Sequence, residues 1–243
     1  QNVESMVKLF NGCSSLRTLS LASFDTSKVT DMSDMFTYCS ALTSLDVTSF
    51  LTSKVKSMSN MFQECSSLTS LNVNRFDTSQ VTEMSNMFAN CQQLKQLDIA
   101  SFNTQNVVSV SAMFNQCISL TSLRIGTLNF AKASYFQFMF HNCTSLTSLE
   151  MANFQTSSTN AKMMAKMFAN CKSLKSLNLV KFQTNSVYSM SELFSGCTSL
   201  VSVDLSKFQT NEVNDMNYMF YKCESLTSLD LSSFRADSVY IMS

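Results

Sequence analysis

The sequence predicts an α/β fold of the solenoid kind, in which about nine similar units stack into one coil. Three observations predict it. The chain repeats at a nearly constant period of 26 residues, and each repeat carries an apolar stripe at helical spacing followed by another at strand spacing. A period of this length is typical of solenoids, whose units bury their apolar faces only against their neighbours.

Nine cysteines mark the period. They are Cys13, Cys39, Cys65, Cys91, Cys117, Cys143, Cys171, Cys197 and Cys223. Successive cysteines are 26 residues apart, except that 28 residues separate Cys143 from Cys171. The repeats begin near residues 3, 29, 55, 81, 107, 133, 161, 187 and 213, with a partial unit from 239. We interpret residues 1–243 as a single repeat solenoid. Because neither end resembles the polar cap that solenoids need, we expect a fragment of a longer protein.

The first half of each unit predicts a short α-helix. In one unit the apolar residues are Val29, Met32, Met35, Phe36 and Cys39, which lie on one stripe of a helix. The residue before the cysteine is Gly or Asn in five of the nine units. These two residue types tolerate the left-handed conformation that ends a helix, so we expect the helix to end just before the cysteine.

The second half of each unit predicts a short strand. Leu45 and Val47 alternate with polar residues, as in a strand with one buried face, and Phe50 follows. Equivalent strands are expected to stack in parallel on one side of the coil. We interpret the Phe50 column as a stacked aromatic spine rather than a cofactor site, and we expect no cofactor. This column contains Phe24, Phe50, Phe76, Phe102, Leu128, Phe154, Phe182, Phe208 and Phe234.

The consensus MxxMFxxCxxLxxLxLxxFxT, seen in DMSDMFTYCSALTSLDVTSF and DMNYMFYKCESLTSLDLSSF, resembles the 26-residue repeat of bacterial surface proteins, the BspA-like class of leucine-rich repeats. The resemblance covers essentially the whole chain. It implies a leucine-rich-repeat-like solenoid of helix–strand repeats, exposed at a cell surface or secreted, that binds host or neighbouring macromolecules and has no shared catalytic residues. Two places depart from the repeat: the unit at residues 128–138, and a two-residue insertion near Ser157–Asn160.

Composition argues against several function classes. Lys and Arg total 17, as do Asp and Glu, so the clustered basic face of a nucleic-acid-binding protein is not expected. No apolar run approaches the ~20 residues of a membrane-spanning helix. His141 is the only histidine and stands in a variable column that we expect to be solvated, so a nucleophile–base pair is not expected and the protein is not predicted to be an enzyme.

The cysteine column has three interpretations. Zinc sites need close pairs such as CxxC, which the sequence lacks. Disulfides between adjacent coils are geometrically possible, but nine equivalent thiols cannot all pair. We favour a ladder of small, buried apolar groups, and we expect no metal.

The first candidate binding site is the outward face of the strands. One of its columns carries hydroxyl groups: Thr18, Ser44, Ser70, Ser122, Ser148, Ser176, Ser202 and Ser228, with Gln96 among them. The other begins at Ser20 and continues through the candidate residues Asp46, Asn72, Asp98, Arg124, Glu150, Asn178, Asp204 and Asp230. Solenoids commonly bind along such a face, so we hypothesise that it docks a basic or polar macromolecule. The alternative is an ordinary solvated sheet face.

The second candidate site is an apolar patch on the helix side. Phe130, Tyr135, Phe138 and Met163 occupy columns that are mostly polar in the other repeats, and they lie beside the insertion. Exposed apolar patches often mark contact surfaces, so we hypothesise lateral self-association or docking of another domain through these residues. Alternatively, the insertion bends the solenoid and these side chains fill the gap.

Taken together, the sequence favours a non-catalytic recognition or adhesion module, extracellular or at the cell surface, that binds a protein or another surface macromolecule. The alternative is a structural role, as a spacer or a self-assembling component of a surface array.

Overall fold

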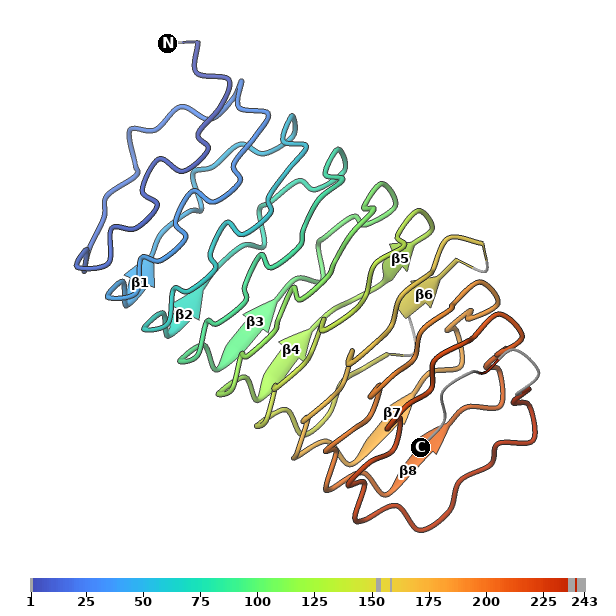
Figure 1. The fold of residues 1–243 in the computed structure, drawn as a ribbon. Helices are drawn as coiled ribbons and strands as arrows, with labels where there is room; N and C mark the ends of the chain where they lie inside the picture. The colour runs from blue at the N-terminus through green and yellow to red at the C-terminus, as the bar shows by residue number, and fades with distance from the viewer. Residues whose placement is uncertain (1, 152–153, 158, 236–238, 240–243) are drawn as a thin grey trace.

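The structure is a computed structural model that describes residues 2–151, 154–157, 159–235 and 239. The chain winds into an elongated stack of coils, with its first residues at one end and its last coils at the other (Figure 1). Each coil corresponds to one repeat of the sequence. The predicted solenoid is therefore confirmed.

Six short strands occupy the LxxLxL segments. They are β1 (Ser44–Leu45), β2 (Ser70–Leu71), β3 (Gln96–Asp98), β4 (Ser122–Arg124), β7 (Ser176–Asn178) and β8 (Ser202–Asp204). They pair in parallel as β1–β2, β3–β4 and β7–β8, and equivalent columns face each other, as in the pairing of Leu97 with Leu123. The strands lie along one side of the stack in Figure 1, where the sequence placed them.

The predicted helices are wrong: the residues that the structure describes contain no helix. In the first half of the coil, alternate backbone N–H groups have different partners. Met35 N–H and Cys39 N–H donate within local turns, to the carbonyls of Met32 and Phe36 at 3.3 and 3.0 Å. Phe36 N–H instead donates 2.9 Å across to the carbonyl of Met61 in the next coil. In an α-helix all of these N–H groups would donate to carbonyls within the helix, and none would be left to donate to the neighbouring coil.

Left-handed backbone also excludes a helix here. Asp34 has φ 59° and Tyr38 has φ 62°. The two equivalent residues of each other coil also have positive φ, among them the Gly and Asn residues that precede cysteines. A left-handed residue every four positions breaks a right-handed helix. The turns still bring apolar residues to one side every three or four positions, so the inward stripe was predicted correctly: Val29, Met32 and Met35 are fully buried.

The most regular aromatic stack lies in the MF column. Its rings are parallel, with centroids 5.5–5.7 Å apart and interplanar angles of 3–13°. It contains Phe10, Phe36, Phe62, Phe88, Phe114, Phe140, Phe168, Phe194 and Phe220. The Phe50 column predicted as the spine is buried over most of its length, but its stacked ring pairs in the described residues run from Phe154 to Phe234, at 5.0–6.5 Å.

The cysteines form the predicted ladder of buried groups. All nine are free, and those from Cys39 to Cys197 are buried. From Cys39 onward each Sγ donates to a Phe carbonyl in the preceding coil, as from Cys65 to Phe36 at 3.3 Å and from Cys91 to Phe62 at 3.2 Å. Burial raises the pKa of the Cys39 thiol from its ordinary value of 9.0 to about 11, so this thiol is protonated at neutral pH.

A second ladder, of buried threonines, was not predicted. Thr78 Oγ1 donates to the carbonyl of Asn103 at 2.9 Å and accepts the N–H of the same residue at 2.7 Å. Thr184 makes the same pair of bonds to Gln209 at 2.9 and 2.7 Å. One hydroxyl therefore satisfies two backbone groups of the next coil, which explains why a polar side chain can be fully buried in this column.

The threonine ladder is interrupted at Phe130. Here the backbone itself pairs: β5 (Leu128–Phe130) lies parallel to β6 (Phe154–Thr156), with Asn129 opposite Gln155. In Figure 1 this pair lies on the arm of the coil that follows the LxxLxL strands. Direct backbone pairing thus takes the place of the missing hydroxyl.

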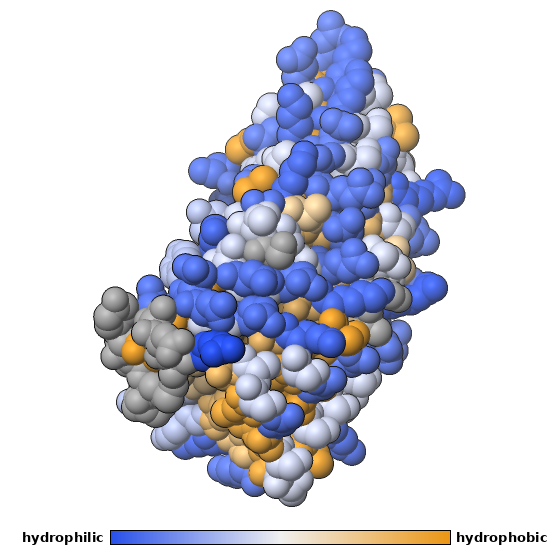
Figure 2. Space-filling view, turned by 90° about the vertical axis from the view of Figure 1, so that its right-hand side faces the viewer, coloured by the Kyte–Doolittle hydropathy of each residue, from blue (hydrophilic) through white to orange (hydrophobic). Residues whose placement is uncertain are grey.

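The apolar columns leave a largely polar exterior. Figure 2 shows a mostly hydrophilic side of the molecule, with small separate hydrophobic spots and one larger hydrophobic area near the lower end of the view. Among the described residues there is no helix long and apolar enough to cross a membrane.

Candidate functional site

The strand face presents its two polar columns to solvent, as predicted. Ser44 and Asp46 are exposed on either side of the buried Leu45, and the same pattern recurs in the other coils. All of the candidate residues in the second column, from Asp46 to Asp230, are exposed. The face is therefore a continuous stripe of hydroxyl groups beside a stripe of mostly carboxylate and amide groups.

Most residues of the second column also close the turn after the strand. Asp46 Oδ1 accepts the backbone N–H of Thr48 at 2.9 Å and its hydroxyl at 2.6 Å. The equivalent bond to the backbone N–H two residues later is made by Asn72, Asp98, Asn178, Asp204 and Asp230. Asp and Asn are the residue types that form this turn, so the column has a structural reason that the sequence analysis missed.

These turns affect both the charge and the freedom of the carboxylates. The hydrogen bonds from Thr48 lower the pKa of Asp46, and those from Ser206 lower the pKa of Asp204. The neighbouring carboxylate of Asp230 opposes the shift at Asp204. The side chains are therefore ionised at neutral pH and held in one orientation.

Arg124 breaks the acidic column. Its Nη1 donates to Asp98 Oδ2 at 2.9 Å, with the two side chains 75% and 46% exposed, so solvent screens the ion pair and it adds little stability. The pKa of Asp98 is lowered first by the backbone N–H of Ala100 and then by Arg124. Arg124 cannot form the acidic turn, and Gly126 follows it with φ 57°. A Cβ on Gly126 would lie 2.7 Å from the carbonyl oxygen of Ala100.

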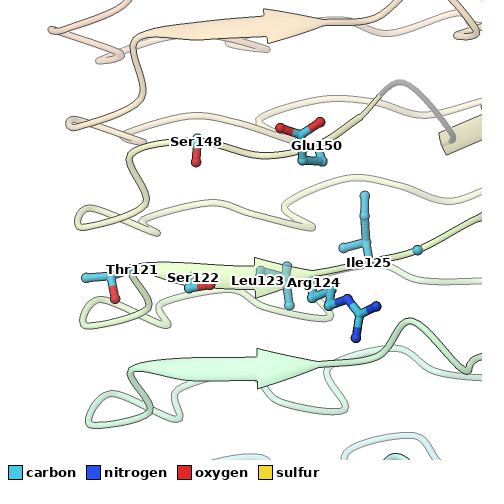
Figure 3. A pocket seen from close by; sticks show the side chains of 8 residues that line it. Thr121, Ser122, Leu123, Arg124, Ile125, Ser148 and Glu150 are labelled. Atoms are coloured by element: carbon cyan, nitrogen blue, oxygen red, sulfur yellow. The ribbon is translucent and has the colours of Figure 1, made fainter.

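A hollow of about 430 Å³ lies between β4 and the next coil. Thr121, Ser122, Arg124, Gly126, Ser148 and Glu150 line it. In Figure 3, Arg124 on β4 points toward β3. Glu150 lies on the coil on the other side of β4, and its carboxylate points away from Arg124. Similar hollows of about 480 and 570 Å³ lie over β7–β8 and β1–β2. The strand face is thus a row of shallow polar depressions with hydrogen-bond donors and acceptors on their rims.

The predicted apolar patch is wrong for Phe130. Its side chain is 1% exposed and packs against Phe136 and Phe154, with ring centroids 5.5 and 4.8 Å away. The alternative interpretation, that it fills space inside the irregular coil, holds for this residue. Tyr135 is 42% exposed, and it pairs with Met163 of the next coil, as expected from their shared column.

Phe138 and Met163 are half-buried. Lys166 covers the Phe138 ring with its ammonium 5.8 Å from the centroid, and Lys166 also pairs with Glu192 at 3.1 Å. The edge of the His141 ring lies against Phe138, at 5.6 Å between centroids. These contacts remove much of the apolar surface that the sequence predicted.

His141 is half-buried rather than solvated. Its Nδ1 lies 2.9 Å from Asn115 Oδ1, and its pKa is lowered by burial and then by the charge of Lys166. The described part of the chain contains no group of three or more His, Cys, Asp or Glu residues placed to hold a metal ion. The chemistry that the exposed surfaces offer is hydrogen bonding, ion pairing and aromatic contact.

Comparison with known proteins places this geometry in a family. The chain matches the family described as "Mycoplasma protein of unknown function, DUF285" over residues 1–72, 67–177 and 147–243. No curated protein matches the chain.

Several solved bacterial structures are similar. A leucine rich cell surface protein from Faecalibacterium prausnitzii is 17% identical, with a TM-score of 0.34, 85% of this chain covered and 79% of that one. A leucine-rich repeat protein from Bacteroides ovatus is 20% identical, with a TM-score of 0.39 and coverage of 99% and 76%. The T. pallidum leucine rich repeat protein is 18% identical, with a TM-score of 0.45 and coverage of 85% and 76%. Since the three family matches together span residues 1–243, the chain belongs to the DUF285 family, as a BspA-like leucine-rich-repeat solenoid.

Proposed function

We propose that the protein is a non-catalytic recognition module, secreted or exposed at a cell surface, that binds a macromolecular partner through its strand face. The observation that carries the proposal is the continuous exposed stripe of Ser, Asp and Asn side chains along the stack. The solved structure from Faecalibacterium prausnitzii is described as a cell surface protein, which agrees with the proposed location. Adhesion is the function that such a module would serve.

The chemistry of the face favours a basic or polar partner. Asp46, Asp204 and Asp230 have lowered pKa values, so their negative charges persist well below neutral pH. Their side chains are already held by turns, so binding does not have to immobilise them, and less conformational entropy is lost on association. Arg124 is the one cation in this column and lies on Asp98, which leaves the acidic residues at either end for the partner.

The test is to remove charge without removing the turns. In the triple variant Asp98→Asn, Glu150→Gln, Asp204→Asn, the amides at positions 98 and 204 keep the oxygen that accepts the turn hydrogen bond. Binding to a panel of basic and neutral surface proteins is measured by biolayer interferometry at two salt concentrations. We expect affinity for a basic partner to fall about tenfold, which corresponds to ~1.4 kcal/mol. Unchanged affinity in the triple variant would overturn the proposal.

A matched control lies outside the strand face. Asp25 and Asp77 are also exposed and accept the N–H groups of Ser27 and Ser79 in the same kind of turn, both at 3.0 Å. Asp25→Asn with Asp77→Asn removes charge from such turns elsewhere on the coil. We expect this control variant to bind as the wild type does.

A structural role is the second candidate, supported by the exposure of Tyr135 beside the half-buried Phe138 and Met163. If these residues mediate self-association, Tyr135→Ser with Phe138→Ser abolishes concentration-dependent assembly in light scattering. Tyr218→Ser is the control, because Tyr218 occupies the column of Phe138, has φ 54° and is 45% exposed. A strict monomer in all three proteins would remove the structural role.

A further inference from the structure

A hollow of about 510 Å³ lies away from the strand face, on the first part of the coils. Its lining residues are Tyr135, Lys162, Asn185, Ser186, Tyr188 and Glu212. They come from three successive coils, so the hollow runs along the stack. It is a separate surface from the one assigned to the macromolecular partner.

The two tyrosines at this hollow are not needed by the fold. The column of Tyr135 contains Ser5, Ser57, Ser109 and Ser189, and the column of Tyr188 contains Ser134 and Thr30. Tyr135 makes the same isolated bridges to its neighbours as those serines do, and Tyr188 N–H donates to the carbonyl of Lys162 at 3.0 Å. The backbone is therefore the same with a small polar residue as with tyrosine.

The rings of Tyr135 and Tyr188 remain open to solvent, with the residues 42% and 39% exposed. Neither ring takes part in the aromatic or cation–π contacts of the described residues. The two tyrosines belong to coils two apart, or ~10 Å along the stack at the usual strand spacing. Two unused aromatic surfaces therefore flank one polar hollow.

The polar groups between the rings balance in charge. Lys162 offers an ammonium and Glu212 a carboxylate, and neither forms a salt bridge within the described part of the chain. Asn185 is exposed and can both donate and accept. With one charge of each sign, the hollow does not select a charged ligand. Its lining contains no aliphatic residue, so it has no pocket for the apolar side chain of a peptide.

We propose that this hollow binds a neutral oligosaccharide. The C–H faces of sugar rings pack on aromatic rings, and their hydroxyl groups can donate to Glu212 and accept from Lys162. A ligand with apolar faces and many hydroxyls matches a site that has two rings and mixed donors and acceptors. At ~10 Å apart, Tyr135 and Tyr188 would contact different sugars of one short chain.

The test uses neutral oligosaccharides of four to six sugars, namely cello-, chito-, manno-, malto- and laminari-series compounds. Saturation-transfer NMR with the full chain detects binding, and a titration gives the Kd. We expect at least one series to bind, and Tyr135→Ser and Tyr188→Ser each to weaken it tenfold or more. Both substitutions insert a residue that already occurs in the same column, so circular dichroism should show an unchanged fold.

Two control variants separate this proposal from others. Tyr218→Ser removes a tyrosine that is 45% exposed elsewhere, and it should leave sugar binding unchanged. The triple variant of the strand face should also bind the sugar normally, so loss of one site does not imply loss of the other. The proposal would be overturned if none of the five series showed saturation transfer. It would also be overturned if both tyrosine variants bound the sugar as tightly as the wild type does. Binding of a peptide such as oligolysine in place of every sugar would overturn it too.

Discussion

The regular coils and the coil around Phe130 hold their neighbours by different means. In the regular coils a buried threonine hydroxyl satisfies two backbone groups of the next coil, as Thr78 does for Asn103. At Phe130 the hydroxyl is absent, and the backbones of β5 and β6 pair directly. In both regions the backbone groups between coils are satisfied, although the group that satisfies them differs. A large apolar residue can enter the column when the backbone supplies the bonds.

The largest expected effect concerns the thiol ladder, which both regions share. Burial raises the pKa of Cys39 to about 11 and that of Cys117 to about 12, from an ordinary value of 9.0. Because the folded pKa exceeds the unfolded one, the stabilisation is complete below pH 9 and is lost as pH rises above it. Each such thiol contributes a loss of ~1.4 kcal/mol per pH unit in that window. Urea unfolding at pH 8, 9 and 10 should therefore show a loss of several kcal/mol.

Other side chains also ionise at alkaline pH, so a variant isolates the thiols. Cys91→Ala with Cys117→Ala removes two titrating groups and should make the decline of stability with pH shallower. Equal slopes for the variant and the wild type would show that the ladder does not cause the alkaline loss.

The next prediction tests the irregular coil. Phe130→Thr inserts the residue that the sibling coils carry, yet we expect it to destabilise the protein by ~2–4 kcal/mol, because the ring that packs on Phe136 and Phe154 leaves a cavity. Thermal or urea unfolding measures the change. A neutral effect would mean that the irregular coil can revert to the regular arrangement, and the comparison would then fail.

Thr78→Val tests the regular coils. Valine has the shape of threonine but leaves the N–H of Asn103 without its 2.7 Å acceptor, so we expect a loss of ~1–3 kcal/mol. Ser79→Ala, next to it in the chain, serves as the control for substitution at this turn. If Thr78→Val matched the control in urea unfolding, the hydroxyl would not be what joins these coils.

The smallest effect is expected at Gly126, which carries the turn beside Arg124. Gly126 has φ 57°, and an added Cβ would lie 2.7 Å from a carbonyl oxygen, so Gly126→Ala should destabilise the protein by ~1–2 kcal/mol. Gly12→Ala is the matched control, since Gly12 also has positive φ but nothing within 4 Å of an added Cβ. The two variants would unfold alike if only the left-handed backbone, and not the close approach of Ala100, mattered.

The candidate site could be predicted only in part. The alternation around Leu45 correctly placed Ser44 and Asp46 outward, because a strand has a period of two. The alternation does not reveal that Asp46 accepts the backbone N–H of Thr48 and so closes a turn. The recurrence of Asp or Asn at this position, which is typical of such turns, would have indicated it. Phe130 was misplaced because its polar column was assumed to face solvent, whereas that column of threonines is buried.

The sequence alone determined the solenoid, the register of its coils and the residues of its core, because a repeated apolar column has nowhere to be buried except against its own copies. Only the tertiary structure decided the local conformation. The spacing of Met32, Met35 and Phe36 suits a helix as well as a series of tight turns. The turns form because alternate N–H groups in the segment before the cysteine, such as Asp34 and Phe36, donate to the next coil, a requirement that no single repeat shows in isolation.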